Sequence, residues 1–139
     1  MGAWIASHPI AYPALEVVHI VGIALLLGNL VLLELRVWGV ARDLPLPVLA
    51  RTALALSLAG FGLVVLSGLT MFSANPLELV ANRAFVVKMG LVTLAGLNAA
   101  WFHARHGLQR LDGLARAQTV LSLGLWLGAI IGGRWIAYA

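Results

Sequence analysis

The sequence contains no cysteine and few charged residues, and both shortages limit its chemistry. Without cysteine the chain cannot form disulfides, hold thiolate-ligated iron–sulfur clusters, use a CxxC redox pair or attach a c-type haem covalently. Asp, Glu, Lys and Arg together make up only 10% of the 139 residues, whereas 62% are hydrophobic. A water-soluble domain of this size needs more polar residues to cover its surface. The composition therefore predicts a protein that lies in the lipid bilayer.

Four long apolar runs predict the fold class, an all-α integral membrane protein with a four-transmembrane-helix bundle. Each run approaches or exceeds the ~20 residues that an α-helix needs to cross ~30 Å of hydrocarbon. Backbone groups in lipid must be hydrogen-bonded within the segment, which favours helices. The predicted helices cover residues 13–38, 51–72, 83–104 and 114–138. We expect them to form one transmembrane domain, with residues 1–12 lying along the membrane interface.

Basic residues are distributed unevenly between the two ends of the predicted helices. The first and third connectors and their flanks contain six arginines, namely Arg36, Arg42, Arg51, Arg105, Arg110 and Arg116. The opposite side has only Arg83, Lys88 and Arg134. By the positive-inside rule, the first and third connectors are predicted to be cytoplasmic and both termini outside. Since the basic residues lie at the ends of apolar runs rather than on one polar face, we do not expect nucleic-acid binding.

His19 is predicted to face the interior of the bundle. A stripe of residues spaced three and four apart shares its helix face, namely His19, Gly22, Leu26, Asn29, Leu33 and Arg36. Glu16 precedes His19 by one turn on the same side. His19 lies about 9 Å below the outer surface and Lys88, in the third predicted helix, about 8 Å below it. We therefore expect His19 and Lys88 to meet across the bundle.

The other histidines are predicted to lie away from this site. His103 follows Lys88 by fifteen residues, or about 22 Å along the helix axis, so one metal ion cannot bind both His19 and His103. His103 and His106 are interpreted as part of the basic cytoplasmic edge, and His8 as interfacial. His19 itself has a simpler interpretation as a hydrogen-bonded core residue, and this alternative stays open.

Three cations on the outer side run against the positive-inside trend and indicate an anionic partner. Haem propionates fit this role, and imidazole is a common haem ligand in apolar bundles. We therefore predict bound haem b with His19 as axial ligand, and with neutral Lys88 or Met71 as the second ligand. A charged Lys88 would instead pair with a propionate or with Glu16. The residues predicted to hold the cofactor are Glu16, His19, Met71, Arg83, Lys88 and Arg134.

Two alternatives come from other residues. Met71, Met89, His8 and His19 offer soft and imidazole ligands near the outer surface, which favours a copper-handling protein. Gly124, Gly128 and Gly132 form a small-xxx-small ridge on the fourth predicted helix. Such a ridge is typical of helix packing within a chain, but it also fits a homo-oligomer or a non-catalytic subunit bound to a partner membrane protein.

Three segments resemble known membrane proteins, namely YPALEVVHIVGIALLLGNLVL, NRAFVVKMGLVTLAGLNAAWFH and GGRWIAYA. They resemble a family of small bacterial four-helix membrane proteins of unassigned function. More distantly, they are similar to the CopD copper-resistance membrane proteins and the HemJ-type protoporphyrinogen oxidases. The HemJ resemblance implies that His19 and Lys88 are the pair associated with haem b. From these resemblances we expect a bacterial inner-membrane protein that transfers electrons near the outer face, as a candidate oxidoreductase component.

Overall fold

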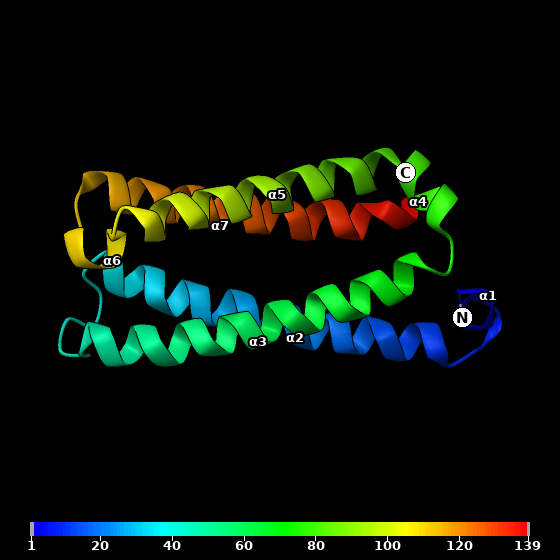
Figure 1. Ribbon diagram of the computed structural model, residues 1–139, viewed down its shortest axis with the longest axis horizontal. Helices are drawn as coiled ribbons and strands as arrows, with labels where there is room; N and C mark the ends of the chain where they lie inside the picture. The colour runs from blue at the N-terminus through cyan, green and yellow to red at the C-terminus, as the bar shows by residue number, and fades with distance from the viewer. Residues whose placement is uncertain (1, 139) are drawn as a thin grey trace. The chain divides into compact units, whose positions relative to one another are not determined.

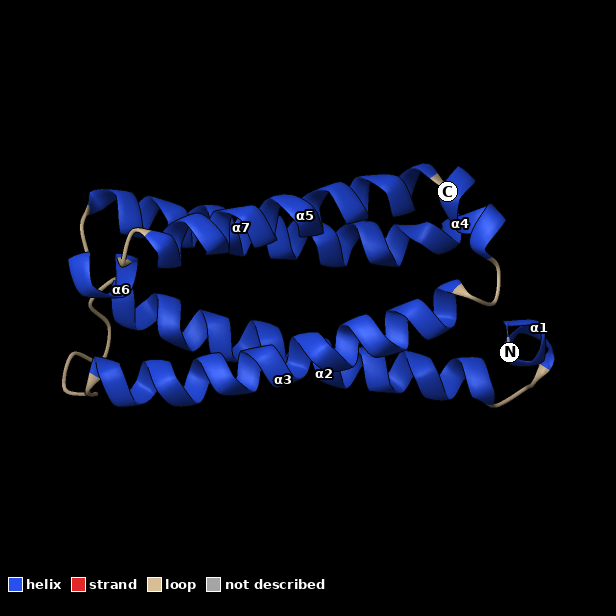
Figure 2. Ribbon diagram, viewed as in Figure 1, coloured by secondary structure: helices blue, strands red, loops and turns tan. Residues whose placement is uncertain are grey.

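The computed structural model describes residues 2–138, and over that range it contains helices and no strands (Figure 2). The four long helices are α2 (Ala11–Val37), α3 (Leu46–Phe72), α5 (Arg83–Ala104) and α7 (Gly113–Trp135). The short ones are α1 (Gly2–Ser7), α4 (Pro76–Ala81), α6 (Gly107–Arg110) and the 3-10 turn η1 (Ile136–Tyr138). Four helical segments are long and apolar enough to cross a membrane, namely α2, α3, α5 and α7 together with η1. By length and composition, the chain is a multi-pass α-helical membrane protein.

The four long helices predicted from the sequence are therefore confirmed, with boundary shifts of one or two residues for α2 and the start of α7 and a larger one for α3. α3 begins at Leu46, five residues before the predicted start at Arg51. Pro45 precedes this helix and Pro47 lies in its first turn, where the missing N–H has no intrahelical partner to lose. Pro45 and Pro47 therefore mark the start of α3, and the connector between α2 and α3 is shorter than predicted.

Many large apolar side chains are exposed, whereas several small or polar ones are buried. Leu58, Leu66 and Ile20 are 71%, 67% and 63% exposed. The buried polar residues are Ser57, Ser67, Asn98, Gln118 and Thr119. This distribution is opposite to that of a soluble protein and is typical of helices in lipid, where small residues let backbones approach.

The chain divides into two compact units. Unit 1 comprises Met1–Leu33 and Asp43–Leu79, and therefore most of α2 together with α3. Unit 2 comprises Glu34–Arg42 and Val80–Ala139, and therefore α5, α6 and α7. Figure 1 shows α2 beside α3, and α5 beside α7.

In unit 1 the backbones of α2 and α3 touch at Gly22 and Gly60. A β-carbon on Gly60 would lie 2.6 Å from the Gly22 carbonyl oxygen and 2.7 Å from the Leu26 amide nitrogen. These distances are shorter than van der Waals contact, so a side chain at this crossing would push the helices apart. Since His19 lies one turn before Gly22, the crossing holds His19 against α3.

The inward stripe predicted for the first helix is confirmed. Gly22, Leu26 and Leu33 are buried, while His19, Asn29 and Arg36 are half-buried. The crossing at Gly60 therefore presents one continuous face of α2 to the interior.

α2 ends in a Schellman motif at Gly39. The Gly39 N–H donates to the Arg36 carbonyl at 3.1 Å, and the Val40 N–H donates to the Leu35 carbonyl at 2.9 Å. Gly39 has a φ of +96°, a conformation that favours glycine. The turn brings the guanidinium of Arg42 over Gly39, where a β-carbon would lie 3.1 Å from the Arg42 Nε.

In unit 2 the side chain of Asn82 connects the start of α5 to the end of α7. Its Oδ1 accepts a hydrogen bond from the Phe85 N–H at 3.2 Å and so caps α5. Its Nδ2 donates to the Ile136 carbonyl at 2.8 Å. One side chain therefore fixes both helix ends on this side of the unit.

Arg105 and Asp112 hold the opposite end of the same helix pair. The Arg105 guanidinium donates to the Asp112 carboxylate at 2.7 Å and to the Gln118 Oε1 at 3.2 Å. The other Asp112 carboxylate oxygen accepts a hydrogen bond from the Ala115 N–H at 2.8 Å and caps α7. Asp112 therefore joins the connector to both helices.

We expect the stability of the protein to decrease in acid as Asp112 becomes protonated. Hydrogen bonds from Arg105 and then from the Ala115 N–H hold the pKa of Asp112 below its ordinary value of 3.8. A carboxylate with a lowered folded pKa stabilises the protein above its unfolded pKa, and this contribution is lost as the pH falls through the folded pKa. Thermal unfolding in detergent at neutral and acidic pH measures the effect. Asp112→Asn should show a weaker acid dependence than wild type, and an equal dependence would contradict the assignment.

Candidate functional site

His19 forms its hydrogen bond to α3 through one ring nitrogen. The His19 Nδ1 lies 2.9 Å from the Ser67 Oγ, and Ser67 is only 3% exposed. The Ser67 hydroxyl in turn donates its single hydrogen to the Leu63 carbonyl at 2.6 Å, with the Val64 carbonyl at 3.3 Å as a weaker acceptor. Since this hydrogen is used within α3, the Ser67 Oγ must act as the acceptor towards His19.

This hydrogen bond assigns the tautomer of His19. Because Ser67 accepts, the hydrogen of the neutral imidazole is on Nδ1. The lone pair of the ring is then on Nε2, the nitrogen that can bind a metal ion. Metal-ligating histidines in proteins usually have their other ring nitrogen fixed in this way by a hydrogen-bond acceptor.

His19 also lies against Gly68 of α3 in unit 1. A β-carbon on Gly68 would lie 3.4 Å from the His19 Cε1, which is ordinary van der Waals contact. The ring of His19 therefore packs against the backbone of α3 at Gly68. The missing side chain at Gly68 and the hydroxyl of Ser67 together set the orientation of the imidazole.

Lys88 lies along two glycines of α7 in unit 2. A β-carbon on Gly132 would lie 3.4 Å from the Lys88 Cβ, and one on Gly133 would lie 3.4 Å from the Lys88 Nζ. The aliphatic part of the side chain therefore covers Gly132 and the amine reaches Gly133. Lys88 is half-buried within a helix that is apolar enough to cross the membrane, where an uncompensated charge is costly.

The other residues predicted for the site lie near helix ends. Glu16 is exposed and lies near Tyr12, and Met71 is half-buried at the end of α3. Arg83 is the exposed first residue of α5. Arg134 donates to the Tyr138 hydroxyl at 3.0 Å, and its guanidinium carbon lies 5.1 Å from the centre of that ring.

The predicted residues divide equally between the two units. Glu16, His19 and Met71 belong to unit 1, whereas Arg83, Lys88 and Arg134 belong to unit 2. In unit 1, Ser67 fixes the His19 ring by a hydrogen bond. In unit 2, Gly132 and Gly133 of α7 leave room for the Lys88 side chain. The meeting of His19 with Lys88 stays a prediction.

No cluster of three or more His, Asp or Glu side chains able to hold a metal ion occurs between residues 2 and 138. His8 uses its Nδ1 to accept hydrogen bonds from the Ile10 and Ala11 N–H groups at 3.2 and 3.1 Å. Met89 is 44% exposed on the outside of α5. A haem differs from such clusters because it requires only one or two axial protein ligands.

Two of the three ridge glycines on α7 face α5 of the same chain. A β-carbon on Gly128 would lie 3.1 Å from the Leu91 Cδ1, and Gly132 contacts Lys88. A β-carbon on Gly124 would meet nothing within 4 Å. The ridge thus packs against α5 within the chain, and its use by a second copy or a partner subunit stays a prediction.

The polar pair Asn98 and Gln118 was not predicted from the sequence. These residues are 7% and 2% exposed, and the Asn98 Nδ2 donates to the Gln118 carbonyl at 2.9 Å. The Asn98 Oδ1 and the Gln118 Nε2 are buried without a hydrogen-bond partner among the described residues. Polar side chains within apolar runs are the signal that would have found them, since such residues in membrane helices usually face the interior.

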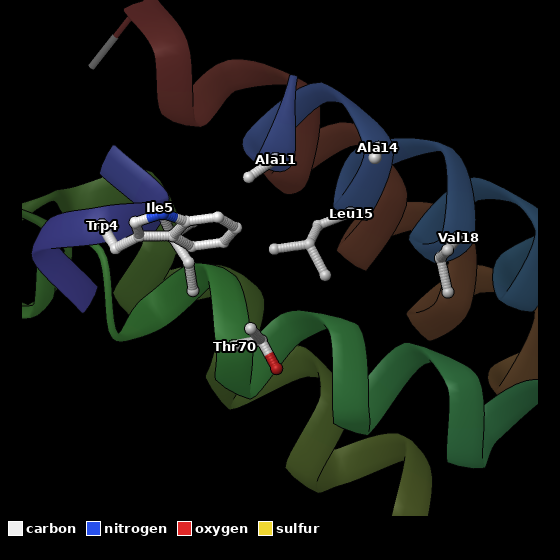
Figure 3. Close-up of a pocket in the computed structure, with 7 residues that line it drawn as sticks. All are labelled: Trp4, Ile5, Ala11, Ala14, Leu15, Val18 and Thr70. Carbon is white, nitrogen blue, oxygen red and sulfur yellow. The ribbon is translucent and has the colours of Figure 1, made fainter. Parts of the chain in front are cut away.

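A shallow apolar pocket of about 310 Å³ lies between α1, α2 and α3 (Figure 3). Trp4 and Ile5 approach it from α1, Leu15 and Val18 from α2, and Thr70 from α3. The Thr70 hydroxyl donates to the Leu66 carbonyl of its own helix, so it is not directed to a ligand. The lining has no titratable group and offers no acid, base or nucleophile.

The comparisons with known proteins give no relative from which a role could be transferred. No known protein family matches the sequence, and no curated protein or solved structure is significantly similar to it. The role of the chain therefore has to be argued from its own residues.

Proposed function

We propose that this chain is a membrane haem-b protein of the bacterial inner membrane, with His19 as an axial ligand. The observation that carries the proposal is the hydrogen bond between the His19 Nδ1 and the Ser67 Oγ. It fixes one ring nitrogen of His19 against a hydrogen-bond acceptor, as is usual for metal-ligating histidines. Both residues lie in helices suited to a membrane, and an apolar helical bundle is a suitable environment for haem.

Lys88 supports the same proposal from unit 2. Its amine lies in a helix that is otherwise apolar at this level, so it needs an anionic partner or a neutral state held by a metal. A haem offers both, since a propionate is anionic and the iron binds a neutral amine. Arg83 and Arg134, at the ends of α5 and α7, add two cations suited to propionates.

Bound haem would supply one-electron transfer, which the side chains of this protein cannot perform themselves. The protein residues would hold the iron through His19, orient the imidazole through Ser67 and compensate the propionates with basic groups. No observation favours the copper alternative, because the His8 Nδ1 accepts two hydrogen bonds at the start of α2 and Met89 is exposed.

The absorbance spectrum of the purified protein tests the proposal. We expect a Soret band in protein purified from cells supplied with haem precursor, or after addition of haemin to apoprotein. Stoichiometric copper in a colourless protein would favour the copper alternative. Protein that is isolated without haem and does not take up haemin would overturn the proposal.

Replacement of Lys88 by leucine is expected to lower haem affinity, because leucine can neither bind iron as an amine nor pair with a propionate as a cation. Arg110→Gln, which removes a positive charge from the α6 segment, serves as the control and should bind haem normally. Haemin titration followed at the Soret band measures both affinities. Equal affinities of Lys88→Leu and wild type would exclude Lys88 from the site.

Lys88→Arg distinguishes the two roles of this lysine. Arginine keeps the charge and can bind a propionate, but its guanidinium does not bind iron as an amine does. A high-spin spectrum with retained haem would therefore identify Lys88 as the second axial ligand. A near-normal spectrum would identify it as the partner of a propionate.

We further propose that both termini lie outside the cell, because six arginines are in the first and third connectors or their flanks. Ser7 and Asp43 are both exposed and lie before and after α2, so they should be on opposite sides of the membrane. A cysteine at Ser7 should react with an impermeant maleimide in intact cells, and a cysteine at Asp43 should react only after lysis. The reverse pattern would show the opposite orientation.

A further inference from the structure

Two arginines in unit 2 lie against consecutive residues at the end of α2. The guanidinium carbon of Arg116 lies 6.0 Å from the centre of the Trp38 indole. The Arg42 guanidinium lies over Gly39, as described for the Schellman motif. Two planar cations therefore flank the Trp38–Gly39 dipeptide.

The indole of Trp38 is fixed by hydrogen bonding to α7. Its Nε1–H donates to the Thr119 Oγ1 at 2.8 Å, and the Thr119 hydroxyl donates to the Arg116 carbonyl at 2.7 Å. Thr119 is 6% exposed, so this arrangement is anchored in the interior. The ring beneath the Arg116 guanidinium is thus held in one orientation.

Two nearby carboxylates have other partners, whereas the Asp43 carboxylate, next to Arg42 in the chain, is exposed. Asp112 binds Arg105, and the Glu34 carboxyl has the Ser122 hydroxyl as its hydrogen-bonding neighbour. Among the described residues, neither Arg42 nor Arg116 forms an ion pair with a carboxylate, and the Arg116 Nε is buried without a hydrogen-bond partner. Arg42 and Arg116 therefore provide two positive charges that no carboxylate pairs with among the described residues, and Arg116 has an unused donor.

The position of Arg116 and Trp38 identifies the anion that suits them. Arg116 lies three residues after the start of α7, or about 5 Å along the helix axis, and Trp38 directly follows α2. Phosphates of lipid headgroups lie at this level of a membrane helix, and tryptophan is enriched there. Guanidinium groups bind phosphate oxygens through paired N–H donors.

We propose that Arg42, Arg116 and Trp38 form a binding site for the headgroup phosphate of an anionic phospholipid. The site is independent of haem binding. Trp38 provides the amphipathic floor, Arg116 binds the phosphate from the first turn of α7, and Arg42 closes the site from the turn after α2. The net charge of the site favours an anionic lipid over a zwitterionic one.

Native mass spectrometry of the full chain in a neutral detergent tests the site with two lipids, phosphatidylglycerol and phosphatidylcholine. Phosphatidylglycerol should bind about tenfold or more tightly than phosphatidylcholine. Arg42→Gln and Arg116→Gln should each weaken its binding about fivefold, as expected for one interfacial arginine. Since Arg42 is exposed and outside the helices, Arg42→Gln keeps the test valid even if Arg116→Gln does not fold.

The matched control is the double variant Arg51→Gln, Arg110→Gln, which removes the same charge from two other exposed arginines. It should bind phosphatidylglycerol as wild type does. Equal losses in the control and in the Arg42, Arg116 double variant would overturn the site, because binding would then depend on total charge alone. Competition by millimolar inorganic phosphate would overturn the lipid as occupant and indicate a site for free anions.

Discussion

His19→Ala is expected to remove most of the bound haem, or to leave a high-spin form held without the imidazole. The substitution deletes the proposed axial ligand and leaves the Ser67 Oγ buried without the N–H that it accepts. His103→Ala is the control, because His103 is exposed on α5 and belongs to the other unit. Its spectrum should be almost unchanged. Equal loss of haem in both variants would contradict the assignment of the ligand.

Ser67→Ala is expected to lower haem affinity, because it removes the hydrogen bond that orients the His19 imidazole but keeps the imidazole itself. Removal of a hydrogen-bond partner of a metal ligand typically lowers metal affinity about 10- to 100-fold. Ser57→Ala is a matched control, since Ser57 is also buried on α3 but its hydroxyl has no hydrogen-bond partner among the described residues. Haemin titrations should separate the two variants. If both bind haemin as wild type does, Ser67 has no role in positioning His19 for haem.

Gly60→Ala is expected to cause a large loss of stability, because it places a methyl group at the crossing of α2 and α3. The new β-carbon would lie 2.6 Å from the Gly22 carbonyl oxygen and 2.8 Å from the Leu25 Cβ. Because the first of these neighbours is backbone, the helices must separate to relieve the clash, at a cost of about 1–3 kcal/mol. Thermal unfolding in detergent and protease resistance measure this loss.

Gly62→Ala is the control for this substitution on the same helix. A β-carbon on Gly62 would meet nothing within 4 Å, so the change adds a methyl group on the outside of α3. Alanine also favours helix more than glycine does, and the variant should be at least as stable as wild type. A similar loss of stability in both variants would show that the crossing at Gly60 is not the cause.

The long helices could be predicted from the sequence because their signal is simple. An apolar run of about twenty residues has few alternatives in lipid, and α5 begins and ends where its composition indicated. The predicted start of α3 at Arg51 is five residues too late, because the sequence gives no apolar boundary at Leu46. A charged residue can lie within the first turns of a membrane helix, whereas Pro47 determines where the helix begins.

The site was only partly accessible from the sequence. Periodicity placed His19 on the inward face of its helix, but it could not pair His19 with Ser67, because this pairing depends on where α2 crosses α3. That crossing depends on the close approach of Gly22 and Gly60. The sequence contains fifteen glycines, and nothing in it shows that these two contact each other. Likewise, the ridge on α7 was recognised, but not the lysine that lies on it.

The outward position of the bulky aliphatic residues has a consequence for how this protein can vary. Leu58, Leu66 and Ile20 face lipid, which is a fluid without fixed shape, so exchanges among Leu, Ile, Val and Phe there should change little. The restrictive positions are instead the small ones, such as Gly22 and Gly60. The identity of the fold therefore depends on a minority of residues with little or no side chain. A water-soluble version could be designed by replacing the outer surface alone and leaving these contacts intact.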